Sequence, residues 1–188
     1  LLPHGFAAEA LGALRVVAIN QGELVEIDPD FRLMRGAANV MMGRASAANA
    51  DLTASALVNN PSAALWRGYS ASLQQNWSDA RRELERGGGG LEEHPPAWRA
   101  RFQLALAHAA LELNDPAAAE AAARAALAEA PDRATRMHAR LAEARVVALR
   151  GDNERALTMF DELARIDDEE VAVRASVDET HMEGALKA

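Results

Sequence analysis

The sequence predicts an all-α protein, and two observations lead to that fold class. Alanine occurs 44 times and leucine 22 times, whereas valine and isoleucine together occur only 13 times. This composition favours helices, because alanine and leucine have high helix propensity while β-branched residues are enriched in strands. Helix start and stop signals, such as Asp115-Pro116 and Gly151, also recur along the chain.

The helices are expected in a regular series. We expect them at residues 6–19, 30–42, 45–58, 62–75, 78–86, 96–113, 116–129, 133–150, 153–165 and 169–184. The candidate N-caps, besides Asp115, are Asp30, Ser78, Asp132 and Asp152. Gly43 and Gly151 stand where helix ends commonly need a positive φ. We expect the apolar face of residues 171–186 to be bare, and the chain to be a piece of a longer protein.

Charge and composition argue against several classes of protein. With 28 acidic and 20 basic residues, the net charge is −8, and the Lys/Arg surplus that a nucleic-acid binder needs is missing. No apolar run of about 18 residues occurs, so no membrane insertion is expected. Cysteine is absent, which excludes disulfides and thiolate chemistry. The 19 arginines against one lysine favour a bacterial source, and the lack of cysteine slightly favours the periplasm over the cytoplasm.

A helix-turn-helix unit recurs along the chain. The clearest copy opens with Leu106-Ala107, turns at 113–116, and ends before Pro131. Its second helix carries Ala119, Ala123 and Ala126. The next copy has Ala144, a turn at 149–152, then Ala156, Phe160 and Leu163, with Asp168 in place of the proline.

Two weaker copies precede these. One has Trp66, Gly68 and Ala71, then Ala80 and Leu84; the other has Gly36, then Ala48 and Leu52. The small first-helix residues Gly36, Gly68, Ala107 and Ala144 are separated by 32, 39 and 37 positions.

This pattern resembles the tetratricopeptide repeat, a helix-turn-helix unit of about 34 residues with small residues where its helices cross. The resemblance covers residues 30–168 and implies a right-handed α-solenoid of four units, at about 30–61, 62–95, 96–131 and 132–168. Residues 1–29 would then form a capping helix and connector, and residues 169–188 the start of a further repeat.

The resemblance also implies a concave groove lined by the first helix of each unit. It places there Ala37, Met41, Tyr69, Ser72, Leu73, Arg101, His108, Glu112, His138 and Arg145. Arg101 and Arg145 would accept a carboxylate or an acidic segment; the alternative is that they pair with Glu112 or neighbouring acids. Family members that grip chaperone tails present asparagines from successive first helices. Here Ala37, Tyr69, His108 and Arg145 occupy those places, so chaperone-tail binding is not expected.

No motif predicts catalysis, a metal or a cofactor. The run Gly87 to Gly90 lacks the Lys-Ser/Thr pair of a phosphate loop, and we expect a flexible connector. The histidines, His4 and His94 included, show no i, i+4 spacing for a metal site, and the acids of 167–170 lack EF-hand spacing. No Gly-x-Ser-x-Gly elbow and no triad spacing are present.

The expected function is that of a non-catalytic scaffold or adaptor. A protein or peptide segment would bind on the concave face, with Tyr69 and Leu73 as anchors. Two alternatives remain open. The chain would be an assembly or regulatory domain of a larger enzyme or cell-envelope machine, or it would form homo-oligomers through residues 171–186.

Overall fold

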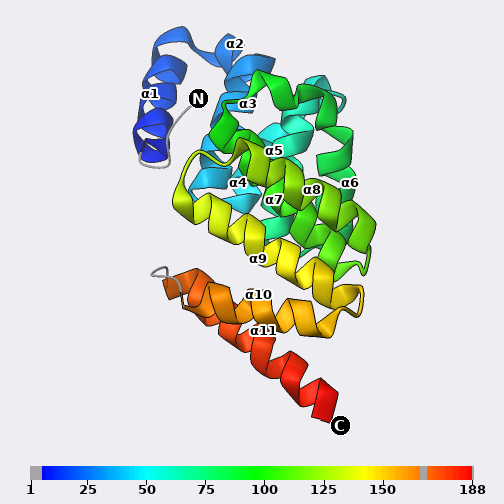
Figure 1. Ribbon diagram of the computed structural model, residues 1–188. Helices are drawn as coiled ribbons and strands as arrows, with labels where there is room; N and C mark the ends of the chain where they lie inside the picture. Colours follow the sequence, from blue (N-terminus) through cyan, green and yellow to red (C-terminus); the bar gives the residue numbers. More distant parts are fainter. Residues whose placement is uncertain (1–5, 166–168, 188) are drawn as a thin grey trace. The chain divides into compact units, whose positions relative to one another are not determined.

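A computed structural model describes residues 6–165 and 169–187, which form helices and no strand. The chain divides into two compact units at the Pro95–Pro96 bond. Figure 1 labels the helices of both. We call the part up to Pro95 unit 1 and the part from Pro96 onward unit 2. The expected boundary residue Asp168, the neighbouring Asp167 and the terminal His4 lie outside the described residues.

Unit 1 contains two principal helix pairs, preceded by two further helices. Its elements are α1 (Ala7–Gln21), α2 (Glu23–Glu26), α3 (Pro29–Met41), α4 (Ala45–Leu52), the 3-10 helix η1 (Ser55–Leu57), α5 (Pro61–Leu73), α6 (Trp77–Arg86) and the 3-10 helix η2 (Gly88–Glu93). The helix expected at 45–58 is wrong in its second half, because α4 ends at Leu52 and η1 follows.

Unit 2 contains two helix pairs and a final helix. Its elements are α7 (Pro96–Glu112), α8 (Pro116–Glu129), α9 (Arg133–Leu149), α10 (Asn153–Ala164) and α11 (Glu169–Lys187). Apart from the helix at 45–58, each expected helix is present with ends that agree to within one turn.

Side-chain caps begin five of the described α-helices. The carboxylate or amide oxygens of Asp28, Asn60, Asp115, Asp132 and Asp152 each accept a hydrogen bond from the backbone N–H three residues later. Two expected caps are wrong: Asp30 lies inside α3 and Ser78 inside α6. The cap of α3 is the preceding Asp28, which is followed by Pro29 at the first helical position.

The turn inside each helix pair has the same backbone conformation. One residue in each turn adopts a positive φ, namely Gly43 (68°), Gln75 (58°), Asn114 (59°) and Gly151 (84°). The next N–H then bonds back to a carbonyl five residues earlier, as from Asn76 to Ala71 at 2.9 Å and from Asp115 to Ala110 at 2.9 Å. This is the Schellman closure of a helix end. Sequence patterns indicated the two glycines but missed Gln75 and Asn114.

The crossing point of each helix pair also recurs. A small residue on the first helix is followed 16 positions later by its partner on the second helix: Gly36 and Leu52, Gly68 and Leu84, Ala107 and Ala123, Ala144 and Phe160. A fully buried alanine stands 12 positions after each small residue, at 48, 80, 119 and 156. A Cβ atom at Gly68 would lie only 2.6 Å from Leu84 Cγ, so these backbones approach closely.

Packing in each unit joins near neighbours in the chain. In unit 1, α3 packs on α4 and α5, α5 packs on α6, and α1 packs on α3. In unit 2, α7 packs on α8 and α9, and α9 packs on α10 and α11. Within each unit, the first helix of one pair therefore contacts its own second helix and the first helix that follows it in that unit.

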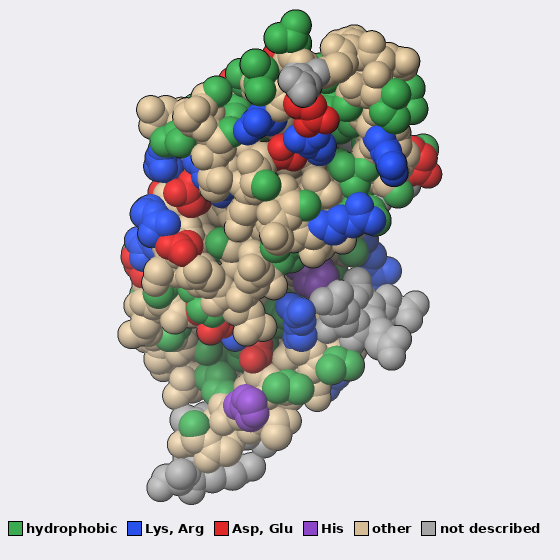
Figure 2. Space-filling model, turned by 180° about the vertical axis from the view of Figure 1, so that it is seen from behind, with side chains coloured by type: hydrophobic (Ala, Val, Ile, Leu, Met, Phe, Trp, Pro, Cys, Tyr) green, Lys and Arg blue, Asp and Glu red, His purple; other side chains and the backbone are tan. Residues whose placement is uncertain are grey.

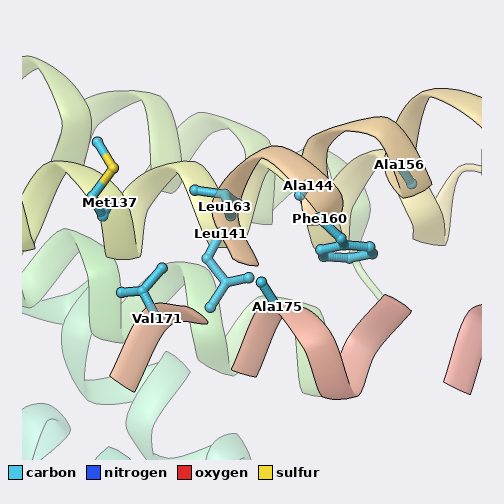
Figure 3. Packing of buried hydrophobic residues seen from close by; sticks show 8 residues of the cluster. All are labelled: Met137, Leu141, Ala144, Ala156, Phe160, Leu163, Val171 and Ala175. Atoms are coloured by element: carbon cyan, nitrogen blue, oxygen red, sulfur yellow. The ribbon is translucent and has the colours of Figure 1, made fainter. Parts of the chain in front are cut away.

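The last helix, α11, packs against the apolar core of unit 2. Figure 3 shows Leu141 of α9 pointing toward Val171 and Ala175 of α11, next to Phe160 and Leu163 of α10. Val171 and Ala175 have no exposed surface, so the expectation of a bare face over residues 171–186 is wrong for these positions. Val173 and Val177 do remain exposed, at 57% and 47%.

The glycine run is not the flexible connector that the sequence predicts. Gly87 ends α6, and a Cβ atom there would lie 2.8 Å from the backbone nitrogen of Leu65. A Cβ atom at Gly90 would lie 3.0 Å from the backbone nitrogen of Ser62. The glycines let η2 pack directly on the first turns of α5, which requires residues without side chains.

Candidate functional site

Three of the expected groove residues lie on α5 of unit 1. Tyr69 is half-buried, and its ring meets that of Trp66 edge-on, with centroids 6.3 Å apart. The hydroxyl of Ser72 donates a hydrogen bond to the carbonyl oxygen of Tyr69 at 2.8 Å. Leu73 is 57% exposed. On α3 of the same unit, Ala37 is buried and offers little surface to a ligand.

The other five lie in unit 2, where Arg145 joins three alternate helices. Its guanidinium lies 3.4 Å from a carboxylate oxygen of Glu112 on α7 and 3.4 Å from one of Asp178 on α11. Arg145 itself belongs to α9. One face of unit 2 therefore presents α7, α9 and α11 together, held by a charged bridge. The pairing of Arg145 with Glu112 agrees with the alternative interpretation given for this arginine.

Histidines 108 and 138 lie near the same bridge. The pKa of His108 is lowered to about 4, chiefly by burial and in addition by the nearby cations Arg145 and Arg174 and by His138. His108 is therefore neutral at pH 7, and its imidazole can donate or accept a hydrogen bond. We call the residues His108, Glu112, His138, Arg145, Arg174 and Asp178 the unit 2 cluster.

The pKa of Asp178 is shifted upward, in the direction opposite to that of His108. The partial burial of Asp178 raises the pKa, while Arg145, His181 and Arg174 act in the lowering direction. Arg145, Asp178 and His181 also line a pocket of about 340 Å³ between α9, α10 and α11, with Phe160 and Met182 as apolar walls. The cluster thus combines charged groups with an adjoining apolar pocket.

Arg101 lies apart from this cluster. Its guanidinium lies over the ring of Trp98 at 4.8 Å from the centroid, a cation–π contact. Along α7, Arg101 precedes Glu112, the partner of Arg145, by about 16 Å at 1.5 Å per residue. Arg101 and the partner of Arg145 therefore lie on different turns of α7, and the joint binding of one carboxylate by Arg101 and Arg145 stays a prediction.

Sequence reasoning missed the contribution of α11. Arg174, Asp178 and His181 follow one another at helical spacing, i, i+4 and i+7, and so share one face of the helix. That spacing was a usable signal.

A second polar constellation in unit 1 brings together a serine, a histidine and a glutamate. The hydroxyl of Ser62 donates to Glu93 Oε2 at 2.8 Å and lies 3.0 Å from His94 Nε2. Ser62 and His94 are 4% and 5% exposed, and burial lowers the pKa of His94. The serine proton goes to the glutamate rather than to the histidine, unlike in a catalytic triad. These contacts fasten η2 to the first turn of α5.

Searches for related proteins found nothing to place this chain: no family model, curated protein or solved structure matches it.

Among the described residues, no helix combines the length and apolar character that crossing a membrane requires. Within residues 6–165 and 169–187, no three histidine, aspartate or glutamate side chains gather in a metal-binding arrangement. Charges of both signs lie side by side on the face shown in Figure 2.

Proposed function

We propose that this chain is a tetratricopeptide-like scaffold, a right-handed α-solenoid that docks a protein or peptide segment and performs no catalysis itself. The recurring pairs of Gly68 with Leu84 and of Ala144 with Phe160 support the repeat assignment. The common turn conformation supports it too, as does the packing, inside each unit, of one first helix on the following first helix. A helix pair of this size cannot bury its apolar side alone, so neighbouring helix pairs in a solenoid stack and share a core.

The docking surface proposed in unit 2 is the face formed by α7, α9 and α11. The observation that carries this proposal is the bridge from Glu112 through Arg145 to Asp178, which brings side chains of three alternate helices onto one surface. Both contacts measure 3.4 Å, longer than the 2.7–2.9 Å typical of a tight charged hydrogen bond. An acidic side chain of the partner would compete for Arg145, with an apolar side chain in the adjoining pocket.

Unit 1 would contribute apolar anchoring. Leu73 and Tyr69 lie on the first helix of its second pair, and the exposed Leu73 is the natural hydrophobic contact.

The test starts from a random 12-residue peptide library displayed on phage and selected on the immobilised chain. We expect selected peptides to be enriched in Asp or Glu next to a large apolar residue. Binding of the selected peptide, measured by fluorescence anisotropy, should weaken about tenfold or more in Arg145→Glu. Arg155→Glu, an exposed arginine on α10, serves as the matched control and should bind normally.

Two results would contradict the proposal. One is a set of selected peptides without acidic residues. The other is unchanged affinity in Arg145→Glu.

A second candidate, self-association through α11, has one observation in its favour. Val173 and Val177 are both exposed on this helix. Light scattering of the chain and of a Val173→Asp/Val177→Asp variant tests it directly. An oligomeric mass for the unmodified chain with a monomeric mass for the variant would favour self-association. A monomeric mass for both would reject it.

A further inference from the structure

A second pocket, built entirely from unit 1, lies between α1, α3 and the start of α4. Its volume is about 390 Å³, within the range of small-molecule sites. Leu11, Arg15, Phe31, Arg35, Asn39 and Arg44 are among the residues that line it. Neither the sequence pattern nor the proposed docking surface in unit 2 involves this pocket.

The arginines of this pocket differ in what they bind. Arg35 is committed, because it donates two hydrogen bonds to the carboxylate of Asp51, at 2.8 and 2.7 Å, and a further one to Glu26. Arg15 and Arg44 form no ion pair with any described residue. The carboxylate of Glu26 also lines the pocket and is paired with Arg35. Arg15 and Arg44 are therefore the two lining guanidinium groups without an ion pair to a described residue, in a protein whose net charge is −8.

Asn39 provides a second, independent observation. The residue is only 7% exposed, yet its carboxamide makes no hydrogen bond within the part of the chain described. Its carboxamide atoms are not among the fully enclosed polar atoms that lack a partner, so they remain accessible from the pocket. Because Asn39 lines the pocket, its amide N–H groups are available to an acceptor placed between Arg15 and Arg44.

We propose that this pocket binds a carboxylate attached to a short aliphatic group. Guanidinium groups match carboxylates through paired hydrogen bonds, and the amide of Asn39 adds a neutral donor. Leu11, Ala18 and Phe31 supply the apolar walls that an aliphatic group would contact. A peptide ending in leucine and a free branched carboxylic acid both have this chemistry, and the experiment separates them.

The experiment uses three probes on the full chain in low salt. They are a fluorescein-labelled pentapeptide ending in leucine with a free carboxylate, the same peptide amidated at its C-terminus, and 4-methylpentanoate as competitor. We expect the free-acid peptide or 4-methylpentanoate, or both, to bind, and the amidated peptide to bind at least tenfold more weakly. Displacement by 4-methylpentanoate would show that the free acid suffices; peptide binding without displacement would assign the pocket to a chain end.

Variants test each part of the pocket. Arg15→Ala/Arg44→Ala should weaken binding at least tenfold, whereas Arg155→Ala in unit 2 should leave it unchanged. Asn39→Leu should weaken binding and leave the melting temperature within about 2 °C of that of the unmodified chain, because the amide makes no hydrogen bond to the described residues. A lower melting temperature in Asn39→Leu would show a structural role instead.

The proposal is overturned if neither acid binds at millimolar concentration, if the amidated peptide binds equally, or if the double arginine variant binds normally. None of these readouts depends on Arg145, so this pocket and the docking surface of unit 2 can fail separately.

Discussion

The two units build the same helix crossing in different ways. In unit 1 the small residue is glycine, and the residue before it is an arginine that pairs with an acid 16 positions later. Arg67 bonds Glu83 at 2.7 Å directly before the crossing of Gly68 and Leu84. The first pair of unit 1 repeats this arrangement with Arg35 and Asp51.

Unit 2 has alanine at the crossing and no such ion pair. The positions that match Arg67 and Glu83 hold Leu106 and Ala122 in the first pair, where both join an apolar cluster. In the second pair they hold Glu143 and Met159. Nevertheless the turn closure and the 16-residue spacing are the same in both units.

This difference shows that the spacing of small and large residues, rather than the ion pair, sets the crossing. The side chains of Arg67 and Glu83 are 11% and 12% exposed, so each would be a costly buried charge without the other. Arg67 also donates to the carbonyl oxygens of Leu52 and Leu57. The ion pair therefore fastens the segment after α4, a task that unit 2 does not require.

The largest expected effect comes from breaking this pair. Arg67→Ala leaves Glu83 with only the longer contacts to Arg86 (3.4 Å) and Arg82 (3.8 Å), and should lower the free energy of unfolding by about 3 kcal/mol in urea denaturation. Replacing both, as in Arg67→Leu/Glu83→Ala, imitates unit 2 and should cost less than the single change. Arg124→Ala, which breaks an exposed pair with Glu120 on α8, is the control and should cost under about 1 kcal/mol. A double variant less stable than Arg67→Ala would show that the pair is essential to the crossing.

The next effect distinguishes the glycines at the two crossings of unit 1. A Cβ atom at Gly68 would meet backbone atoms, Leu84 N at 2.8 Å and Ala80 O at 3.0 Å. At Gly36 the closest atoms belong to the flexible side chain of Leu52. Gly68→Ala should therefore cost about 2–3 kcal/mol by thermal melting, and Gly36→Ala clearly less. Gly184→Ala, with nothing within 4 Å, should instead stabilise by about 0.5–1 kcal/mol. Equal losses at Gly36 and Gly68 would contradict this contrast.

The next prediction concerns how the free energy of unfolding depends on pH through one histidine in each unit. The pKa of His108 falls to about 4 on folding, below its ordinary 6.5, so the folded state resists protonation. Its contribution to stability is complete above pH 6.5 and is lost as the pH falls from 6.5 toward 4, by about 1–2 kcal/mol at pH 5. The pKa of His94 in unit 1 is lowered too, so it acts in the same direction.

Urea denaturation at pH 7.5 and pH 5 measures this loss in the unmodified chain and in His108→Gln and His94→Gln. The raised pKa of Asp178 acts in the opposite direction, so the difference between the chain and each variant isolates the histidine. We expect a smaller loss in both variants. If His108→Gln lost as much unfolding free energy between pH 7.5 and pH 5 as the unmodified chain, the prediction for unit 2 would be contradicted.

The smallest effect concerns the turns. Gln75 in unit 1 has a φ of 58° at the position where the other turns have Gly43, Asn114 or Gly151. Gln75→Gly should stabilise the chain by about 1 kcal/mol, because a left-handed backbone is strained for glutamine and not for glycine. Asn114→Gly in unit 2 should gain less, since asparagine tolerates this conformation. Thermal melts of the two variants give the comparison; a destabilised Gln75→Gly would rule out strain at this turn.

The candidate sites were only partly predictable. Arg145, His108 and Glu112 were identified from their places on successive first helices, and all three do come together in unit 2. The role of Asp178 was missed. The site formed by Arg15, Asn39 and Arg44 carried no sequence signal, because its residues lie on separate helices and share no motif.

The sequence alone determined the helices, their turns and the small residues at their crossings, because these depend on propensity, capping and spacing within one or two helices. Only the tertiary structure decided which charges meet. Arg145 is shared between Glu112 and Asp178, 33 positions away on either side, and Gly87 to Gly90 became a packed turn because α5 lies against it. Such pairings depend on the relative placement of helices distant in the chain, which local patterns do not specify.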